Sequence, residues 1–183
     1  PPGQSECGNL FSVPSSPDGR FEATSDMCIL PENFTPLDEA ECSQIADELS
    51  MQYGLAAETS QASYTDPITQ LTGTSCLIVL EGSAVQFENL ANVHTTITQV
   101  LNRLTFIEDT ALGQGDGPTG FMIGFRQGNK TCRVLAEWVP AEDANCPTDQ
   151  PITACDLTPE QMLYTLTLNC VEEPLDSVAL PKT

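Results

Sequence analysis

Eight cysteines spread along the whole chain constrain its fold more than any other feature of the sequence. Their number is even, no two of them form a C-x-x-C pair, and the chain has a single histidine. Structural zinc sites need clustered cysteines and histidines at short spacings, so the pattern favours a disulfide framework. Disulfides persist in oxidising compartments, which predicts an extracellular protein, secreted or on the cell surface, or a periplasmic one in a Gram-negative bacterium. The cysteines are Cys7, Cys28, Cys42, Cys76, Cys132, Cys146, Cys155 and Cys170.

The chain is strongly acidic, with a formal net charge of −20 and only six basic residues in 183. This charge repels nucleic acid and anionic membrane surfaces, so we expect neither as a partner. It favours solubility outside the cell and is also compatible with cation binding or with a basic partner. No apolar run is long enough for a membrane span. The first residues, Pro1-Pro2-Gly3, are unusual for a translation start, so we expect a mature chain from which a signal peptide has been removed.

Two segments have apolar residues at helical spacing. The first helix is expected from about Pro36 to Tyr53, with Thr35 as its N-cap, Pro36 at its first position and Gly54 at its end. Its apolar stripe comprises Cys42, Ile45, Ala46, Leu49 and Tyr53. Residues 88–106 also favour a helix, although the β-branched residues between His94 and Thr98 leave a strand as the alternative.

Strands are expected at residues 76–80 and 162–170, at 21–30, and in a hairpin whose arms flank the turn Gly128-Asn129. The second arm alternates, which predicts one buried face and one face in water. The buried face holds Cys132, Val134, Ala136 and Trp138, and the wet face holds Thr131, Arg133 and Glu137. Polar residues at 55–73 and at 140–151 indicate long loops.

These elements predict an α+β fold in which about two helices accompany an antiparallel sheet of four to five strands, stapled by disulfides. If residues 88–106 form a strand instead, the alternative is a mostly-β barrel or sandwich with one helix. At this length we expect a single extracellular domain over residues 1–183, with an irregular segment at 1–20 and an acidic tail at 171–183.

Eight cysteines allow 105 pairings, so the connectivity does not follow from the sequence alone. The expected elements favour three pairs, namely Cys7 with Cys28, Cys42 with Cys76, and Cys146 with Cys155. Cys132 and Cys170 both fall on predicted core faces, and we expect each of them to join the sheet to a neighbouring element.

No residue pattern supports a catalytic, metal or cofactor site. His94 would have to serve any histidine-dependent mechanism, yet the chain has no G-x-S-x-G motif. Adjacent carboxylates are common but are typical of solvated faces. These pairs are Asp38 and Glu39, Asp47 and Glu48, Glu108 and Asp109, Glu142 and Asp143, and Glu172 and Glu173. The glycine-rich residues 113–120 lack the lysine of a phosphate-binding loop and precede a strand, so we interpret them as a connector.

Two short patterns suggest modification or anchoring. Asn33-Phe34-Thr35 and Asn129-Lys130-Thr131 are sequons for N-glycosylation, and both asparagines are expected to be exposed. The last four residues, Leu180-Pro181-Lys182-Thr183, resemble the LPXT sequence that remains after a sortase cuts its signal. This resemblance implies a sortase-anchored surface or pilus protein, and it conflicts with the glycoprotein interpretation.

The sequence therefore predicts a non-enzymatic secreted or cell-surface protein that acts as a binding module or as a structural subunit of an extracellular assembly. We expect a protein partner or self-assembly. The alternative is a secreted inhibitor or a carrier of a small ligand, for which an exposed apolar stretch at Phe121-Met122-Ile123 or a cavity beside Trp138 would provide the site. A hydrolase that uses two carboxylates fits least well.

Overall fold

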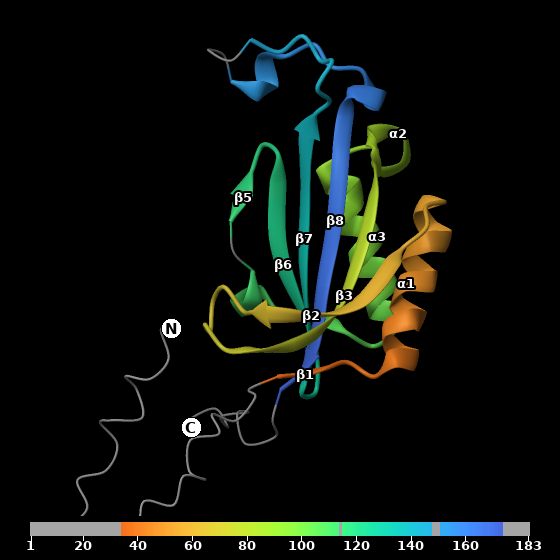
Figure 1. Cartoon of the computed structure of the whole chain (residues 1–183), viewed down its shortest axis with the longest axis vertical. Coiled ribbons are helices and arrows are strands. Elements are labelled where there is room, and N and C mark those ends of the chain that lie inside the picture. The colour runs from red at the N-terminus through yellow and green to blue at the C-terminus, as the bar shows by residue number, and fades with distance from the viewer. Residues whose placement is uncertain (1–33, 114, 148–150, 174–183) are drawn as a thin grey trace, which may run out of the picture. The chain divides into compact units, whose positions relative to one another are not determined.

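The computed structural model describes residues 34–113, 115–147 and 151–173. In these residues an antiparallel sheet carries helices on one of its faces (Figure 1). The helices are α1 (Glu39–Tyr53), α2 (Ala84–Phe87) and α3 (Leu90–Arg103), with 3-10 turns at η1 (Thr110–Leu112), η2 (Ile152–Ala154) and η3 (Pro159–Gln161). The strands are β1 (Thr35–Pro36), β2 (Glu58–Thr65), β3 (Thr72–Ser83), β4 (Ile107–Glu108), β5 (Asp116–Gly117), β6 (Gly120–Gln127), β7 (Lys130–Pro140) and β8 (Met162–Glu172).

The strands run in the order β2-β3-β8-β7-β6-β4, with β1 paired to β8 and β5 paired to β6. The predicted α+β class with an antiparallel sheet is confirmed, and three α-helices are present in the described residues where about two were predicted. The predicted strand count is too low, since eight strands are present in the described residues. Three of them have only two residues, too few to produce a period in the sequence. The mostly-β alternative is wrong, because residues 90–103 form α3.

Strand β2 lies where a loop was predicted at residues 55–73. It pairs with β3 without a break, from Glu58 opposite Val79 to Thr65 opposite Thr72. The prediction failed because β2 is an edge strand whose side chains are mostly exposed, so it carries no apolar alternation. In Figure 1, β2 and the first part of β3 cross the sheet on the side away from α3.

Helix α1 begins three residues later than predicted. Asp38 is the N-cap, and its carboxylate accepts a hydrogen bond of 2.9 Å from the amide of Ala40. Thr35 and Pro36, the predicted first residues, instead pair with β8. The predicted end is confirmed, because Gly54 adopts the left-handed conformation with φ of 65° and closes the helix. The predicted apolar stripe of α1 is buried.

Helix α3 forms despite its β-branched residues. Its four buried residues, Val93, Ile97, Val100 and Leu101, lie at helical spacing and pack into the core. The side chain of Asn89 caps its first turn by accepting a hydrogen bond from the amide of Asn92. Each β-branched residue lowers the stability of a helix by about 0.5 kcal/mol relative to alanine. Burial of each valine or isoleucine side chain stabilises the fold by roughly 1.5–3 kcal/mol. The apolar period therefore decides the structure of this segment.

The main core lies between the helices and one face of the sheet, which we call the inner face. The predicted hairpin is present, with Gly128 at its turn in the left-handed region. Predicted inner residues of β7 and β8 are buried as expected. They are Cys132, Val134, Ala136 and Trp138 on β7, and Tyr164, Leu166, Leu168 and Cys170 on β8.

The opposite, outer face of the sheet is covered at one end. The prediction that Thr131 and Arg133 face solvent is therefore wrong. Both are buried, and only Glu137 of the predicted wet residues is exposed. Leu112 of η1 packs directly over Gly124 of β6, where a β-carbon would overlap it. The β2–β3 hairpin also reaches this end of the outer face, since Asp66 between the two strands contacts Arg133. Leu112, Asp66, Thr131 and Arg133 are all buried as a result.

Three disulfides lie in the described residues, and two of them, Cys42–Cys76 and Cys146–Cys155, join the predicted pairs. The third joins Cys132 of β7 directly to Cys170 of β8, with Cα atoms 4.1 Å apart. Each of these two cysteines was expected to bond a neighbouring element. They bond each other because they are direct cross-strand partners on the inner face.

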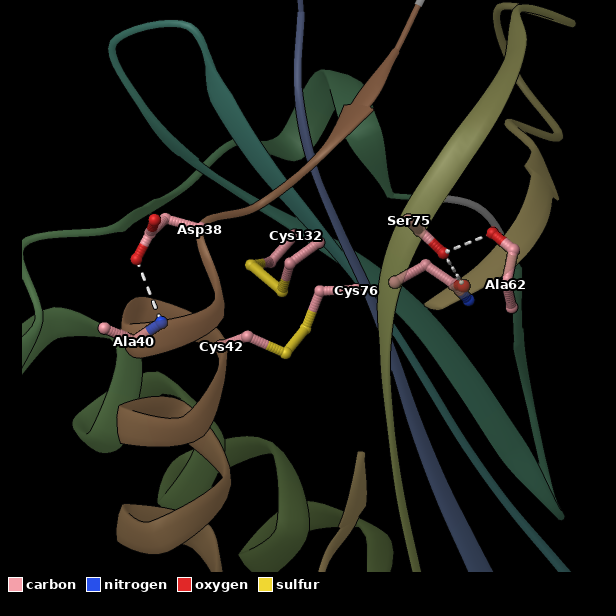
Figure 2. Close-up of a disulfide and its surroundings, with 9 residues drawn as sticks. Asp38, Ala40, Cys42, Ala62, Ser75, Cys76 and Cys132 are labelled. Carbon is pink, nitrogen blue, oxygen red and sulfur yellow. Dashed lines mark hydrogen bonds between the residues drawn. A yellow bond between two sulfur atoms is a disulfide. The ribbon is translucent and has the colours of Figure 1, made fainter. Parts of the chain in front are cut away.

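Two of the disulfides lie next to each other in the sheet. Cys76 and Cys170 are register partners on β3 and β8, so the bonds connect α1 to three central strands along one row. Figure 2 shows the bond from Cys42 to Cys76 beside the bond of Cys132, with Ser75 turned to the other face of β3. Ser75 donates a hydrogen bond of 2.8 Å to Oδ1 of Asn169.

Several predictions concern the ends of the chain. Five of them lie outside the described residues. These are the pair Cys7–Cys28, the strand at 21–30, the irregular segment 1–20, Asn33 and the terminal Leu180-Pro181-Lys182-Thr183. The tail was predicted to start at residue 171, but β8 continues to Glu172 and Val171 is buried.

Candidate functional site

An open cleft lies between the first half of α3 and the first half of β6. Its volume is about 660 Å³. This volume falls within the roughly 300–1,000 Å³ typical of ligand pockets. Its lining is mainly apolar and comprises Leu90, Ala91, His94, Thr95, Gly113, Gly115, Phe121, Met122 and Ile123.

The cleft lies where the strand pairing beside β6 is interrupted. Strand β4 pairs with β6 only at Phe125 and Arg126, and β5 pairs with it only at Gly120 and Phe121. Neither strand pairs with β6 at residues 122–124, where the amide of Met122 donates to the carbonyl of Gly115 and the carbonyl of Gly124 accepts from the amide of Asp109. On the helix side, residues 90, 91, 94 and 95 share one face of α3 because they are spaced by one helical turn. The helix and the open part of β6 form the two walls.

His94 is the main polar side chain of the cleft. Its ring meets the ring of Phe121 edge-on, with centroids 5.6 Å apart. Its Nε2 atom lies 3.4 Å from Oε1 of Glu108, which comes from β4. The two side chains are 40% and 31% exposed, so solvent reaches this pair. The hydroxyl of Thr95 donates to the carbonyl of Ala91, which leaves its lone pairs available to a ligand.

This arrangement can bind a ligand but displays no nucleophile beside a base. Among the described residues, no serine or cysteine is hydrogen-bonded to His94, and no group of three or more His, Cys, Asp or Glu side chains is placed to hold a metal ion. His94 is a partly exposed residue of α3. Its position in the cleft follows only from the fold.

The predicted carboxylate pairs do not converge in one pocket. Members of three pairs form ion pairs with basic residues on the surface. In the described part of the chain, all four lysine and arginine side chains form ion pairs with carboxylates. The pairs are Arg103 with Glu48, Arg126 with Asp109 and Glu173, Lys130 with Glu41 and Glu172, and Arg133 with Asp66. The other carboxylates of the described residues therefore form no ion pair with these four basic side chains.

The pair of Asp66 and Arg133 is buried, with both side chains only 4% exposed and Nε 2.6 Å from Oδ2. Asp66 also accepts hydrogen bonds from the amides of Ile68 and Thr69, and Arg133 donates to the carbonyl of Leu112. Burial alone would raise the pKa of Asp66, but the bonds from Arg133 and from the two amides hold it below its ordinary value. Sequence reasoning missed this pair because Asp66 lies in a polar stretch that gives no sign of burial.

Of the two sites suggested for a small ligand, the stretch from Phe121 to Ile123 does line the cleft. Trp138 does not line it, and its indole packs against Tyr164 with centroids 6.5 Å apart. Asn129 lies at the hairpin turn as expected but is half-buried, because its amide donates to the carbonyl of Glu173. Asn129 is thus partly exposed, and its glycosylation stays a prediction.

A smaller groove of about 250 Å³ lies between α1 and β2, beside the bond of Cys42 and Cys76. No helix in the described part of the chain is both long enough and apolar enough to span a bilayer. Comparisons of the chain with protein-family models, with curated proteins and with solved structures found no match.

Proposed function

We propose that this protein is a non-enzymatic extracellular binding protein that holds the apolar part of a small ligand in the cleft between α3 and β6. The observation that carries the proposal is the cleft itself, with a volume of about 660 Å³ and walls that are apolar apart from a few polar groups. Ligand pockets combine such walls with a small number of polar groups that orient the ligand. His94 and Thr95 would serve that purpose here.

The charge of the chain narrows the class of ligand. The described bases are all held in ion pairs, and the net charge of the whole chain is −20. Glu108 adds a carboxylate beside His94 at the cleft. An anionic ligand such as a fatty acid would be repelled, so the ligand is neutral or cationic.

The disulfides support a role outside the cell. The bonds Cys42–Cys76 and Cys132–Cys170 hold α1 and three central strands without lining the cleft. They are consistent with an oxidising compartment. A scaffold held in this way would keep the two walls of the cleft preformed, which lowers the entropy cost of binding.

The test is a fluorescence titration of the full chain with the neutral apolar dye N-phenyl-1-naphthylamine. Ala91 is exposed on α3 and lines the cleft, so Ala91→Phe would place a large ring in the cleft without changing a core residue. Gln99→Phe places the same side chain at an exposed position of the same helix away from the cleft. We expect Ala91→Phe to weaken binding by about tenfold or more, equal to about 1.4 kcal/mol, and Gln99→Phe to leave it unchanged.

Two results would overturn the proposal. One is the absence of saturable binding by the wild-type chain. The other is equal affinity for the wild-type chain and Ala91→Phe, which would place the dye elsewhere. Dodecylamine and dodecanoate as competitors test the charge of the ligand, and we expect the amine to displace the dye at the lower concentration.

A further inference from the structure

The uncovered part of the outer sheet face carries an ordered pattern of apolar and acidic residues, which we call the outer patch. It consists of Val79 and Glu81 on β3, Leu135, Glu137 and Val139 on β7, and Leu163 on β8. These residues share a face because they alternate with buried inner residues along each strand.

The register arranges the outer patch in rows that cross the strands. Val79 and Leu135 are both partners of Thr167, and Val139 is the partner of Leu163. Leu135, Val139 and Leu163 are 39%, 58% and 42% exposed. Exposed apolar residues that recur in rows on one sheet face can form part of an interaction surface.

An acidic row lies between the two apolar rows. Glu81 and Glu137 are both partners of Thr165, one on each side of it. Neighbouring strands are about 4.8 Å apart, so these two carboxylates flank Thr165 at a separation of about 10 Å. Neither forms an ion pair with the bases in the described part of the chain, each of which is already engaged with other carboxylates.

We propose that the outer patch docks a protein partner that places a lysine or arginine over Thr165, between apolar side chains that cover the two apolar rows. Rows on one face of a strand are about 7 Å apart, which sets the spacing between the basic and apolar groups of the partner. The basic group would lie within reach of both carboxylates, and the apolar groups would bury the exposed leucines and valines.

A second copy of this chain fits the patch poorly. Face-to-face association would bring Glu81 and Glu137 against carboxylates of the other copy, in a chain whose net charge is −20. Like charges placed opposite each other across an interface disfavour association. Charge complementarity therefore selects a basic partner. This inference does not rest on ligand binding in the cleft between α3 and β6, although Met122 of the cleft is the register partner of Leu135.

The experiment uses a cyclic hairpin peptide that presents leucine, lysine and leucine on one face, together with a version that has glutamate in place of lysine. Binding of each labelled peptide to the full chain is measured by fluorescence anisotropy. We expect the lysine peptide to bind about tenfold more tightly than the glutamate peptide, equal to about 1.4 kcal/mol. Rising salt should reduce this preference.

Variants locate the site. Glu81→Gln with Glu137→Gln should reduce the preference for lysine to about twofold or less, because one neutralised pair removes the local attraction. The matched control is Glu39→Gln with Asp47→Asn, which removes the same charge from exposed positions on α1 and should leave the preference intact. Leu135→Ser should weaken the binding of both peptides by a similar factor.

Each contrary result would overturn the proposal. A lysine held over Thr165 would be excluded if neither peptide binds or if the two peptides bind with equal affinity. It would also be excluded if the α1 control loses as much of the preference for lysine as Glu81→Gln with Glu137→Gln does. Sedimentation equilibrium provides the remaining test. A wild-type dimer that Leu135→Ser dissociates would identify a second copy as the occupant instead of a basic partner.

Discussion

Replacing Arg133 by leucine removes the cation that faces the buried carboxylate of Asp66. The change breaks the 2.6 Å hydrogen bond from Nε to Oδ2 and also leaves the carbonyl of Leu112 without the donor that it has in the structure. A charge-assisted hydrogen bond contributes about 1.5–3 kcal/mol, and a buried acceptor left unpaired costs about 1–3 kcal/mol. We therefore expect the free energy of unfolding to fall by about 3–5 kcal/mol, as for other broken buried ion pairs.

The assay is urea unfolding of the oxidised full chain, from which the free energy of unfolding is obtained by linear extrapolation. Arg126→Leu is the matched control, because Arg126 also contacts two carboxylates, Asp109 and Glu173, but is about one-third exposed. Solvent screens that pair, so its loss should cost less than about 1 kcal/mol. A loss for Arg133→Leu below about 1 kcal/mol, or no larger than that for Arg126→Leu, would refute the assignment of Asp66 and Arg133 as a buried pair.

The same pair predicts a dependence on acid. Because the pKa of Asp66 is lowered in the folded chain, its contribution is fully present above the pKa of the unfolded chain and is lost as the pH falls through the lower folded value. Asp66→Asn should therefore flatten the fall of the unfolding free energy between about pH 5 and pH 2 relative to wild type. Parallel curves for the two chains would contradict this.

Three further changes test the packing of the fold. Gly124→Ala should destabilise the chain by about 1–3 kcal/mol in urea unfolding, because its β-carbon would overlap Leu112, and an unchanged midpoint would be inconsistent with that packing. Cys132→Ala with Cys170→Ala opens a loop with a sequence separation of 38, for which the chain-entropy model gives about 4 kcal/mol, measured as the drop in unfolding free energy. Gly54→Ala meets no atom within 4 Å but forces a left-handed φ on alanine, so thermal unfolding should show a loss of about 1 kcal/mol, and no loss would argue against this cap.

The sequence predicts those elements of the fold in which apolar residues recur at a single spacing, helical or alternating. The stripe of α1 and the alternation of β8 place their buried residues correctly, because each segment buries one face against a single core. The pairing of Cys42 with Cys76 follows from the same logic, since the stripe and the buried strand must meet. Long-range pairing between direct cross-strand partners, as for Cys132 and Cys170, requires the strand order, which no local pattern contains.

The parts that the sequence does not predict depend on polar residues in tertiary contact. Arg133 alternates as a wet residue but is buried by Asp66 and Leu112, which come from distant segments. Strand β2 is polar because it lies at an edge. In the cleft, the stretch from Phe121 to Ile123 was identifiable as apolar, whereas the position of His94 opposite it depends on how α3 crosses β6.

The most direct test of the central claim, that the cleft between α3 and β6 binds a small apolar ligand, is a map of amide chemical shifts in the ¹⁵N-labelled full chain. The chain is titrated with N-phenyl-1-naphthylamine at constant pH. We predict that the largest shifts fall at residues 90–95 and 121–123 and that they saturate at the affinity found by fluorescence. Shifts centred instead on Val79, Leu135 and Leu163, or the absence of saturating shifts, would contradict the claim.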